Sequence, residues 1–273
     1  MASVLATRTA PAAPLTLRGA VEAVRRQEPL LFWAGVGHLV LAPLFLALAP
    51  FDGRTILGVD PWVKPTKFTL SIGIYLITIA ALLLPLAASR TKGFIRQTSV
   101  WTMVGEMAII VAQAARGTTS HFNIATPLDA VLFQVMGILI MAATAAAIAL
   151  LVLYLKPVPV AKPVRWGIRL GLLVMLIGSA AGGQMVANQG HTVGGEDGGA
   201  GLPFLTWSTE HGDLRAAHFL GLHGLQVLPL LGLAVAGRAR HAERVVMVAA
   251  VVYAVAVLFL YVHALLGRPL LAL

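Results

Sequence analysis

Seven stretches of about 20 mostly apolar residues, separated by short polar connectors, constrain this chain more than any other feature. Of its 273 residues, 58% are hydrophobic and only 11% are charged. A soluble domain carries roughly 25% charged residues, so these charges are too few to cover a surface that faces water. The sequence therefore predicts an all-α fold, an integral membrane bundle of seven transmembrane helices. The predicted spans are about residues 29–50, 68–86, 99–115, 127–155, 164–187, 214–236 and 245–266.

The basic residues alternate between connectors and predict the orientation of the chain. The N-terminal tail, the connectors 88–97, 156–163 and 237–244, and the nearby Arg165 and Arg169 hold 14 of the 20 Lys and Arg. The positive-inside rule then places the N-terminus in the cytoplasm and the C-terminus in the periplasm, in a plasma (inner) membrane. Because the two termini then lie on opposite sides of the membrane, the number of spans must be odd.

The same pattern predicts two regions. Residues 1–28 form a cytoplasmic N-terminal tail, and residues 29–267 form the seven-helix domain with an outer Gly-rich loop at 188–213. Within the tail, residues 16–27 fit either a short amphipathic helix on the membrane surface or an unstructured segment.

Composition excludes several classes of site and partner. The chain has no cysteine, which rules out disulfides, Fe–S clusters, thiolate zinc sites and c-type haem attachment. The net charge of +9 is explained by basic residues that flank apolar spans, so it does not indicate nucleic-acid binding. Any haem b or divalent metal would need His, Asp, Glu or similar ligands.

Four histidines lie inside the predicted spans. His218 and His223 share the sixth span with Arg215 and Gln226, and all four fall within an arc of roughly 140° on one helix face. Two cross-helix pairs have comparable depth and fit bis-imidazole haem ligation, His218 with His263 and His223 with His38. The competing interpretation is that each imidazole makes a hydrogen bond between helices.

Glu106 is the one acid deep in a predicted span, and Gln113 lies seven residues further along the same face. Intramembrane carboxyl groups are costly, so Glu106 is a candidate proton relay or counter-charge for a ligand. A structural hydrogen bond is the alternative.

The outer connectors carry a second group of polar candidates. In one interpretation Arg116 with Lys64 or Lys67 binds an anionic head group, a carboxylate or a haem propionate. In the other, these cations pair with acids of the same connectors. A zinc-type site near the outer surface would use His121, His191, His211 and Asp213, together with His218. The remaining polar candidates are Asp60, Asn123, Asp129, Gln113 and Gln226.

Three strings, DPWVKPTKF at 60–68, ARGTTSHFN at 115–123 and GDLRAAHFLGLHGLQVLP at 212–229, resemble those of a group of bacterial polytopic inner-membrane proteins of unknown function. The resemblance extends from the first span to about the sixth, and implies a bacterial inner membrane but no activity. The pattern departs from two better-known seven-helix classes. The last span lacks the retinal Lys of microbial rhodopsins and the H-x-x-x-H pair of the alkaline ceramidase and adiponectin-receptor group.

Three functions follow from these candidates, all with the lipid bilayer and a small-molecule ligand or cofactor as partners. The first is a His- and Arg-lined pocket in the outer half that binds haem or a metal for electron transfer or quinone-linked redox chemistry. It would use His38, His218, His223 and His263 as ligands, and Arg116 and Arg215 as anchors. The alternatives are a transporter or receptor-like module for a small anion or lipid head group, and a membrane-embedded metal hydrolase. An assembly factor without a ligand is a further possibility.

Overall fold

The computed structural model describes residues 16–271. In this range seven helices are long and apolar enough to cross a membrane, which confirms the predicted all-α, multi-pass fold. A shorter helix α1 precedes them, and a 3-10 turn η1 and one antiparallel pair of two-residue strands complete the fold. The elements are α1 Leu17–Gln27, α2 Pro29–Leu48, η1 Ala49–Phe51, α3 Val63–Leu83, α4 Arg90–Arg116, α5 Pro127–Leu155, α6 Lys162–Asn188, β1 Thr192–Val193, β2 Gly212–Asp213, α7 Leu214–Val235 and α8 Ala242–Leu265.

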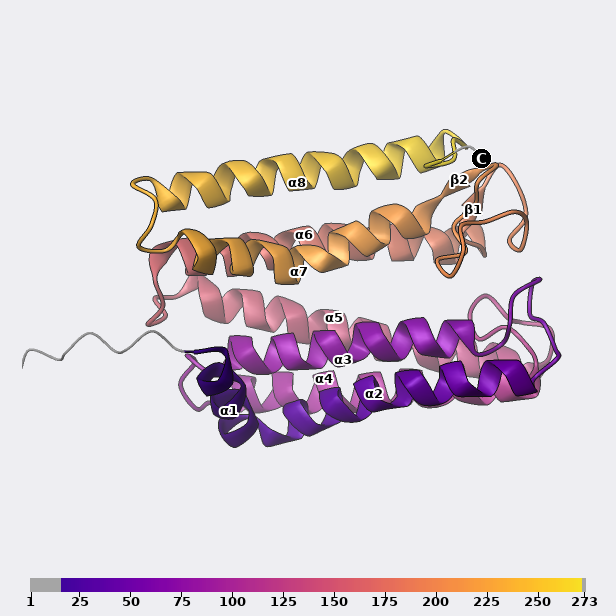
Figure 1. Ribbon diagram of the computed structural model, residues 1–273, viewed down its shortest axis with the longest axis horizontal. Coiled ribbons are helices and arrows are strands. Elements are labelled where there is room, and N and C mark those ends of the chain that lie inside the picture. The colour runs from indigo at the N-terminus through magenta and orange to yellow at the C-terminus, as the bar shows by residue number, and fades with distance from the viewer. Residues whose placement is uncertain (1–15, 272–273) are drawn as a thin grey trace, which may run out of the picture.

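The seven long helices run along one common axis (Figure 1). Helix α3 packs on α2 and α4, α5 joins α4 to α6, and α7 lies between α6 and α8. Helix α1 lies at one end of the bundle, and the loops around β1 and β2 lie at the other (Figure 1). We call these the α1 end and the loop end.

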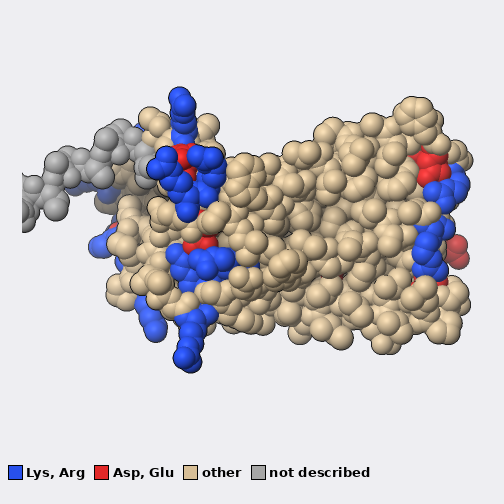
Figure 2. All heavy atoms as spheres, turned by 90° about the horizontal axis from the view of Figure 1, so that it is seen from below, with Lys and Arg blue, Asp and Glu red and all other residues tan. Residues whose placement is uncertain are grey.

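Charged residues gather at the two ends and leave a broad uncharged belt between them (Figure 2). Spanning helices of 20 to 29 residues are roughly 30–44 Å long at 1.5 Å per residue. A hydrocarbon core about 30 Å thick fits inside that length. The belt is therefore the surface that meets lipid.

Two of the helices, α3 and α4, begin well before the predicted start of their spans. Helix α4 begins at Arg90 rather than at residue 99, after Ser89 accepts a hydrogen bond from the amide of Lys92. Helix α3 begins at Val63 rather than at residue 68, so Lys64 and Lys67 lie in its first turns. Hydropathy locates the apolar part of a span, whereas backbone hydrogen bonding continues the helix into the polar membrane interface.

Glycines bring α6 and α7 into close contact. A Cβ on Gly178 would lie 2.6 Å from the Cα of Gly221, and one on Gly171 would lie 2.6 Å from the carbonyl oxygen of Gly224. Small residues of this kind let membrane helices approach closely. The contact fixes the position of α7, whose first turn borders the site described below.

Glu28 joins three helices at the α1 end. Its carboxylate, which is fully buried between α1 and α2, accepts hydrogen bonds of 2.6 and 3.0 Å from Arg96 of α4. The ammonium of Lys92 lies 3.1 Å away. No local pattern singles out Glu28, because its partners lie more than 60 residues away in the chain. Residues 1–15 of the predicted tail lie outside the described residues, and the placement of α1 on a membrane surface stays a prediction.

Candidate functional site

A cavity of about 380 Å³ opens at the loop end of the bundle. Its walls come from the segment that leads into α3 and the first turns of α3, the last turns of α4 and the connector after it, the loop 188–213 and the first turn of α7. Apolar side chains form one part of the lining, among them Phe68, Ile110 and Phe122. The polar lining residues are Asp60, Lys64, Lys67, Thr118, Thr119, Ser120, His121, Gln189, His191, Asp197, Thr206 and Arg215.

Helix termini place these side chains. Asp60 accepts a 2.8 Å bond from the amide of Trp62 just before α3 begins, and Gly117 ends α4 with a left-handed φ of 73°. Asp213 caps α7 by accepting from the amide of Arg215. Side-chain caps and a left-handed glycine are the usual ways to end helices sharply. These caps direct three connectors, those before α3, after α4 and before α7, toward one cavity.

Two lysines bring positive charge to the cavity without a carboxylate partner. The Nζ atom of Lys64 lies 3.2 Å from Nδ1 of His121. Lys67 donates to the carbonyl of Leu205 at 3.0 Å and to the hydroxyl of Thr206 at 3.1 Å. Within residues 16–271, no acidic oxygen lies within 4.0 Å of either ammonium group.

Arg215 differs from the two lysines because its charge is neutralised locally. Its guanidinium lies 2.6 Å from the Oδ2 atom of buried Asp213 and also donates to the hydroxyl and carbonyl of Thr206. The structure therefore places Arg215 at the cavity wall, as predicted from its helix face, but with an internal counter-charge.

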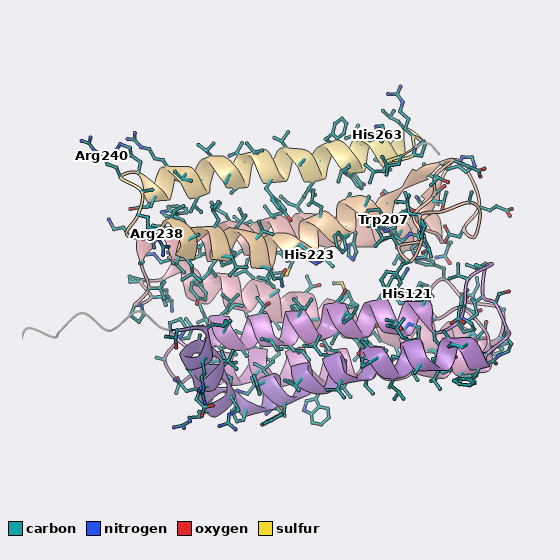
Figure 3. All side chains as sticks on the ribbon, in the orientation of Figure 1. His121, Trp207, His223, Arg238, Arg240 and His263 are labelled. Carbon is teal, nitrogen blue, oxygen red and sulfur yellow. The ribbon has the colours of Figure 1, made fainter. Side chains whose placement is uncertain are left out.

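His121 stands among aromatic rings and is uncharged near neutral pH. It lies toward the loop end of the bundle (Figure 3). Its ring centroid is 5.7, 6.0 and 6.5 Å from those of Phe68, Phe122 and Phe133. Burial, reinforced by the cation of Lys64, holds the pKa of His121 well below its ordinary value. Nδ1 of neutral His121 can accept a hydrogen bond from Lys64, which leaves the proton of the ring on Nε2.

His191 and Asp197 form a second fixed pair in the cavity wall. Nδ1 of His191 donates to Asp197 at 2.6 Å, and the backbone amides of His191 and Thr192 donate to the same carboxylate at 2.9–3.0 Å. Burial lowers the pKa of His191 although Asp197 opposes the shift. Burial alone would raise the pKa of Asp197, but these hydrogen bonds outweigh it and lower that pKa. The carboxylate of Asp197 therefore links residues 191, 192 and 197 within the loop 188–213.

Backbone strain concentrates around the cavity. In residues 16–271, five residues other than glycine have a left-handed φ between 51° and 61°, and all five lie in loop-end connectors. Four of them line the cavity: Leu57, Phe122, Gln189 and Thr206. Such conformations cost about 1–3 kcal/mol each and cluster at functional sites, where the surrounding structure holds them.

The four histidines proposed as haem ligands do not line this cavity in the described part of the chain. His38 of α2 is buried and donates to Ala34 of its own helix at 2.7 Å. His223 of α7 likewise donates to Phe219 at 2.7 Å. Because α2 packs on α3 and α4 while α7 packs on α6 and α8, the proposed pairing of His38 with His223 gains no support.

The proposed pairing of His218 with His263 gains no support from the structure either. Nδ1 of His218 donates across the helix interface to the carbonyl of Gly178 at 2.9 Å. Nε2 of His263 donates to the carbonyl of Pro269 at 3.0 Å. His218 therefore makes the kind of hydrogen bond between helices that the competing interpretation described, whereas His263 bonds to the segment that follows its own helix.

Arg116 is paired away from the cavity. Its guanidinium lies 2.7 Å from Asp129 at the start of α5, and Gln113 donates to the same carboxylate at 2.8 Å. Asn123 donates to the hydroxyl of Thr118 at 2.9 Å, which closes the connector. This cluster joins α4 to α5, and the role of Arg116 as a ligand anchor stays a prediction.

The remaining candidates occupy separate positions. The ring of His211 covers Gly195, and Asp213 is committed to Arg215. Gln226 of α7 donates to Thr78 of α3 at 3.2 Å. Among residues 16–271, no group of three or more His, Asp or Glu side chains is arranged to hold a metal ion, so the hydrolase alternative lacks geometric support.

Sequence reasoning missed Asp197 and Thr206 as members of the site. Both lie in a glycine-rich loop that looks featureless in sequence, and their partners are set by loop geometry. A spacing of six between His191 and Asp197, on either side of a Gly-Gly turn, was the available signal for their pairing.

Comparisons with family models, curated proteins and solved structures found no match to this chain. The resemblance of the three strings quoted above therefore stays a prediction. Any function proposed for the chain therefore rests on the geometry of the cavity alone.

Proposed function

We propose that this multi-pass membrane protein is a binding module or transporter for a small organic anion, which it holds in the cavity at the loop end. The observation that carries the proposal is the pair Lys64 and Lys67, two cavity-lining ammonium groups without a carboxylate within ion-pair distance in the described chain. Buried charges in proteins are usually paired. An anionic ligand supplies the missing charge.

The other walls of the cavity narrow the class of ligand. A volume of about 380 Å³ is at the lower end for small-molecule sites. Phe68, Ile110 and Phe122 provide apolar contact, while Ser120 and Thr206 provide hydroxyl groups. A carboxylate with a short apolar chain matches this combination better than a fully hydrophilic anion. The positive-inside pattern assigns the cavity to the periplasmic side of the membrane.

Thermal unfolding of purified protein in nanodiscs tests the proposal. Sodium butyrate is titrated at pH 7 and constant ionic strength, with sodium chloride and sodium phosphate as parallel series. We expect saturable stabilisation by butyrate, on the order of 2.7 kcal/mol at 100 times its Kd. Lys64→Gln and Lys67→Gln should each remove most of this stabilisation.

Arg238→Gln is the matched control, because Arg238 is exposed at the α1 end and lies in the connector between α7 and α8. It should leave the butyrate response unchanged. Equal effects of all three salts on the wild-type protein would contradict an anion site. Stabilisation by phosphate alone would keep the site but overturn the organic ligand class.

A further inference from the structure

Helix α1 differs in direction from the seven long helices. It lies across the end of the bundle, whereas the others follow the common axis (Figure 1). Its 11 residues are about 16 Å long at 1.5 Å per residue, too short to cross a hydrocarbon core about 30 Å thick. The helix lies at one of the two ends where charged residues gather beside the uncharged belt (Figure 2). This is the level of the polar membrane interface.

One face of α1 carries an apolar stripe that the bundle covers only in part. At 100° per residue, Leu17, Val21 and Val24 fall within an arc of about 60°. Val24 is 6% exposed and belongs to the main apolar core, whereas Val21 is 46% and Leu17 83% exposed. The same stripe is therefore packed against the bundle toward its C-terminal end and exposed toward its N-terminal end.

Both ends of α1 are held in place. At its start, the hydroxyl of Thr16 accepts a 3.2 Å hydrogen bond from the amide of Gly19. At its end, the buried carboxylate of Glu28 bonds to Arg96 and lies 3.1 Å from the ammonium of Lys92. The exposed part of the stripe thus belongs to a fixed helix, and its direction relative to the bundle is defined.

Arginines lie beside the stripe. Arg18 and Arg25 are within about 60° of Val21 on the helix surface, and Arg26 lies further round. Glu22 is the one acid of α1 and pairs with both Arg25 and Arg26, so the helix keeps a net positive charge. Exposed apolar residues next to cations are typical of helices that lie in the membrane interface. The charge is complementary to anionic lipid head groups.

We propose that α1 binds the surface of an anionic phospholipid leaflet. Leu17 and Val21 insert among the acyl chains, and the neighbouring arginines bind head-group phosphates. Two observations favour lipid over a second protein chain as the partner: α1 lies beside the lipid-facing belt, and it is positively charged. The proposal does not depend on the anion cavity, which lies at the other end of the bundle.

Single cysteines test the inserted face, because the chain contains no cysteine of its own. Leu17→Cys, Val21→Cys and the control Gln27→Cys are labelled with a fluorophore in the full-length protein, in phosphatidylglycerol nanodiscs. Gln27 is exposed but lies about 80° round the helix from Leu17. We expect a nitroxide on the acyl chains to quench the probes at positions 17 and 21, and aqueous iodide to quench the probe at 27. Quenching of the probes at 17 and 21 by iodide alone would overturn the proposal.

The lipid class is tested by repeating the Leu17→Cys measurement in phosphatidylcholine nanodiscs. An arginine near an anionic surface changes the binding equilibrium by roughly fivefold, so acyl-chain quenching should be weaker in phosphatidylcholine. Adding Arg18→Gln and Arg25→Gln should remove most of the difference between the two lipids. The control pair Arg238→Gln and Arg240→Gln, exposed at the same end but outside α1, should retain it. Equal quenching in both lipids before any arginine is changed would overturn the anionic head group as the partner.

Discussion

At the residue scale, the pairing of a charge decides what the side chain does. Lys64 and Arg116 are both cations of the loop end, and the sequence grouped them as anchors for one anion. Arg116 has a carboxylate at 2.7 Å, whereas Lys64 has a neutral imidazole at 3.2 Å. An ion pair already made leaves little charge for a ligand, so the two residues have different uses.

The buried imidazoles predict a pH dependence of stability. Burial lowers the pKa of folded His121 and His191 below the ordinary value of about 6.5. As pH falls through about 6.5, the unfolded chain binds protons that the folded chain does not, so stability present above that pH is lost below it. We expect the melting temperature in detergent to fall between pH 7.5 and pH 5.5.

The variant His121→Gln removes one of these groups and should flatten the pH profile. His241→Gln, which changes an exposed histidine at the α1 end, should retain the wild-type slope. Asp197 stays largely ionised in both states above pH 5 and so contributes little in this window. A wild-type melting temperature that is constant from pH 7.5 to pH 5.5 would contradict the prediction.

At the element scale, the α6–α7 contact holds one wall of the cavity in place. Its glycines admit no side chain, because a Cβ on Gly178 would meet the backbone of Gly221. Backbone cannot move aside as a flexible side chain can, so any larger residue must separate the helices. The first turn of α7, with Arg215, would move with them.

Gly178→Ala tests this contact. We expect it to destabilise the protein by about 1–3 kcal/mol, as overpacking commonly does, and to lower the melting temperature. Gly137→Ala on α5 is the matched control, since a Cβ there meets nothing within 4 Å. Alanine favours a helix over glycine by up to about 1 kcal/mol, so the control should keep or gain stability. Equal melting temperatures for both variants would show that the close contact is not rigid.

At the scale of the whole molecule, the separation of charge at two ends predicts how the bundle lies in the membrane. More basic residues belong to the α1 end and its connectors than to the loop end. Lys and Arg near spans remain on the cytoplasmic side. We therefore expect the cavity to open to the periplasm.

Cysteine labelling in intact cells measures this orientation directly, because the chain contains no cysteine of its own. Glu210→Cys at the loop end and Arg240→Cys at the α1 end each introduce a single exposed thiol. A membrane-impermeant maleimide should label Glu210→Cys in intact cells, and Arg240→Cys only after permeabilisation. The reverse pattern would invert the predicted orientation.

Hydropathy along the chain was enough to predict the seven spans and, for the span 127–155, both ends of the helix α5. Hydropathy is a local property, and a bilayer selects for it over each 20-residue segment independently of the rest of the chain. The sequence also indicated Lys64, Lys67, His121 and Arg215 as polar candidates at the loop end.

Which of the candidate residues meet became visible only in the folded chain. The fold gave His38 and His223 hydrogen bonds within their own helices, paired Arg116 with Asp129, and brought His191 and Thr206 to the same cavity as Lys64. Those outcomes depend on the rotation of each helix about its axis and on the path of the loop 188–213. Both are set by contacts between residues far apart in the chain, such as Gly178 with Gly221, which no local pattern specifies.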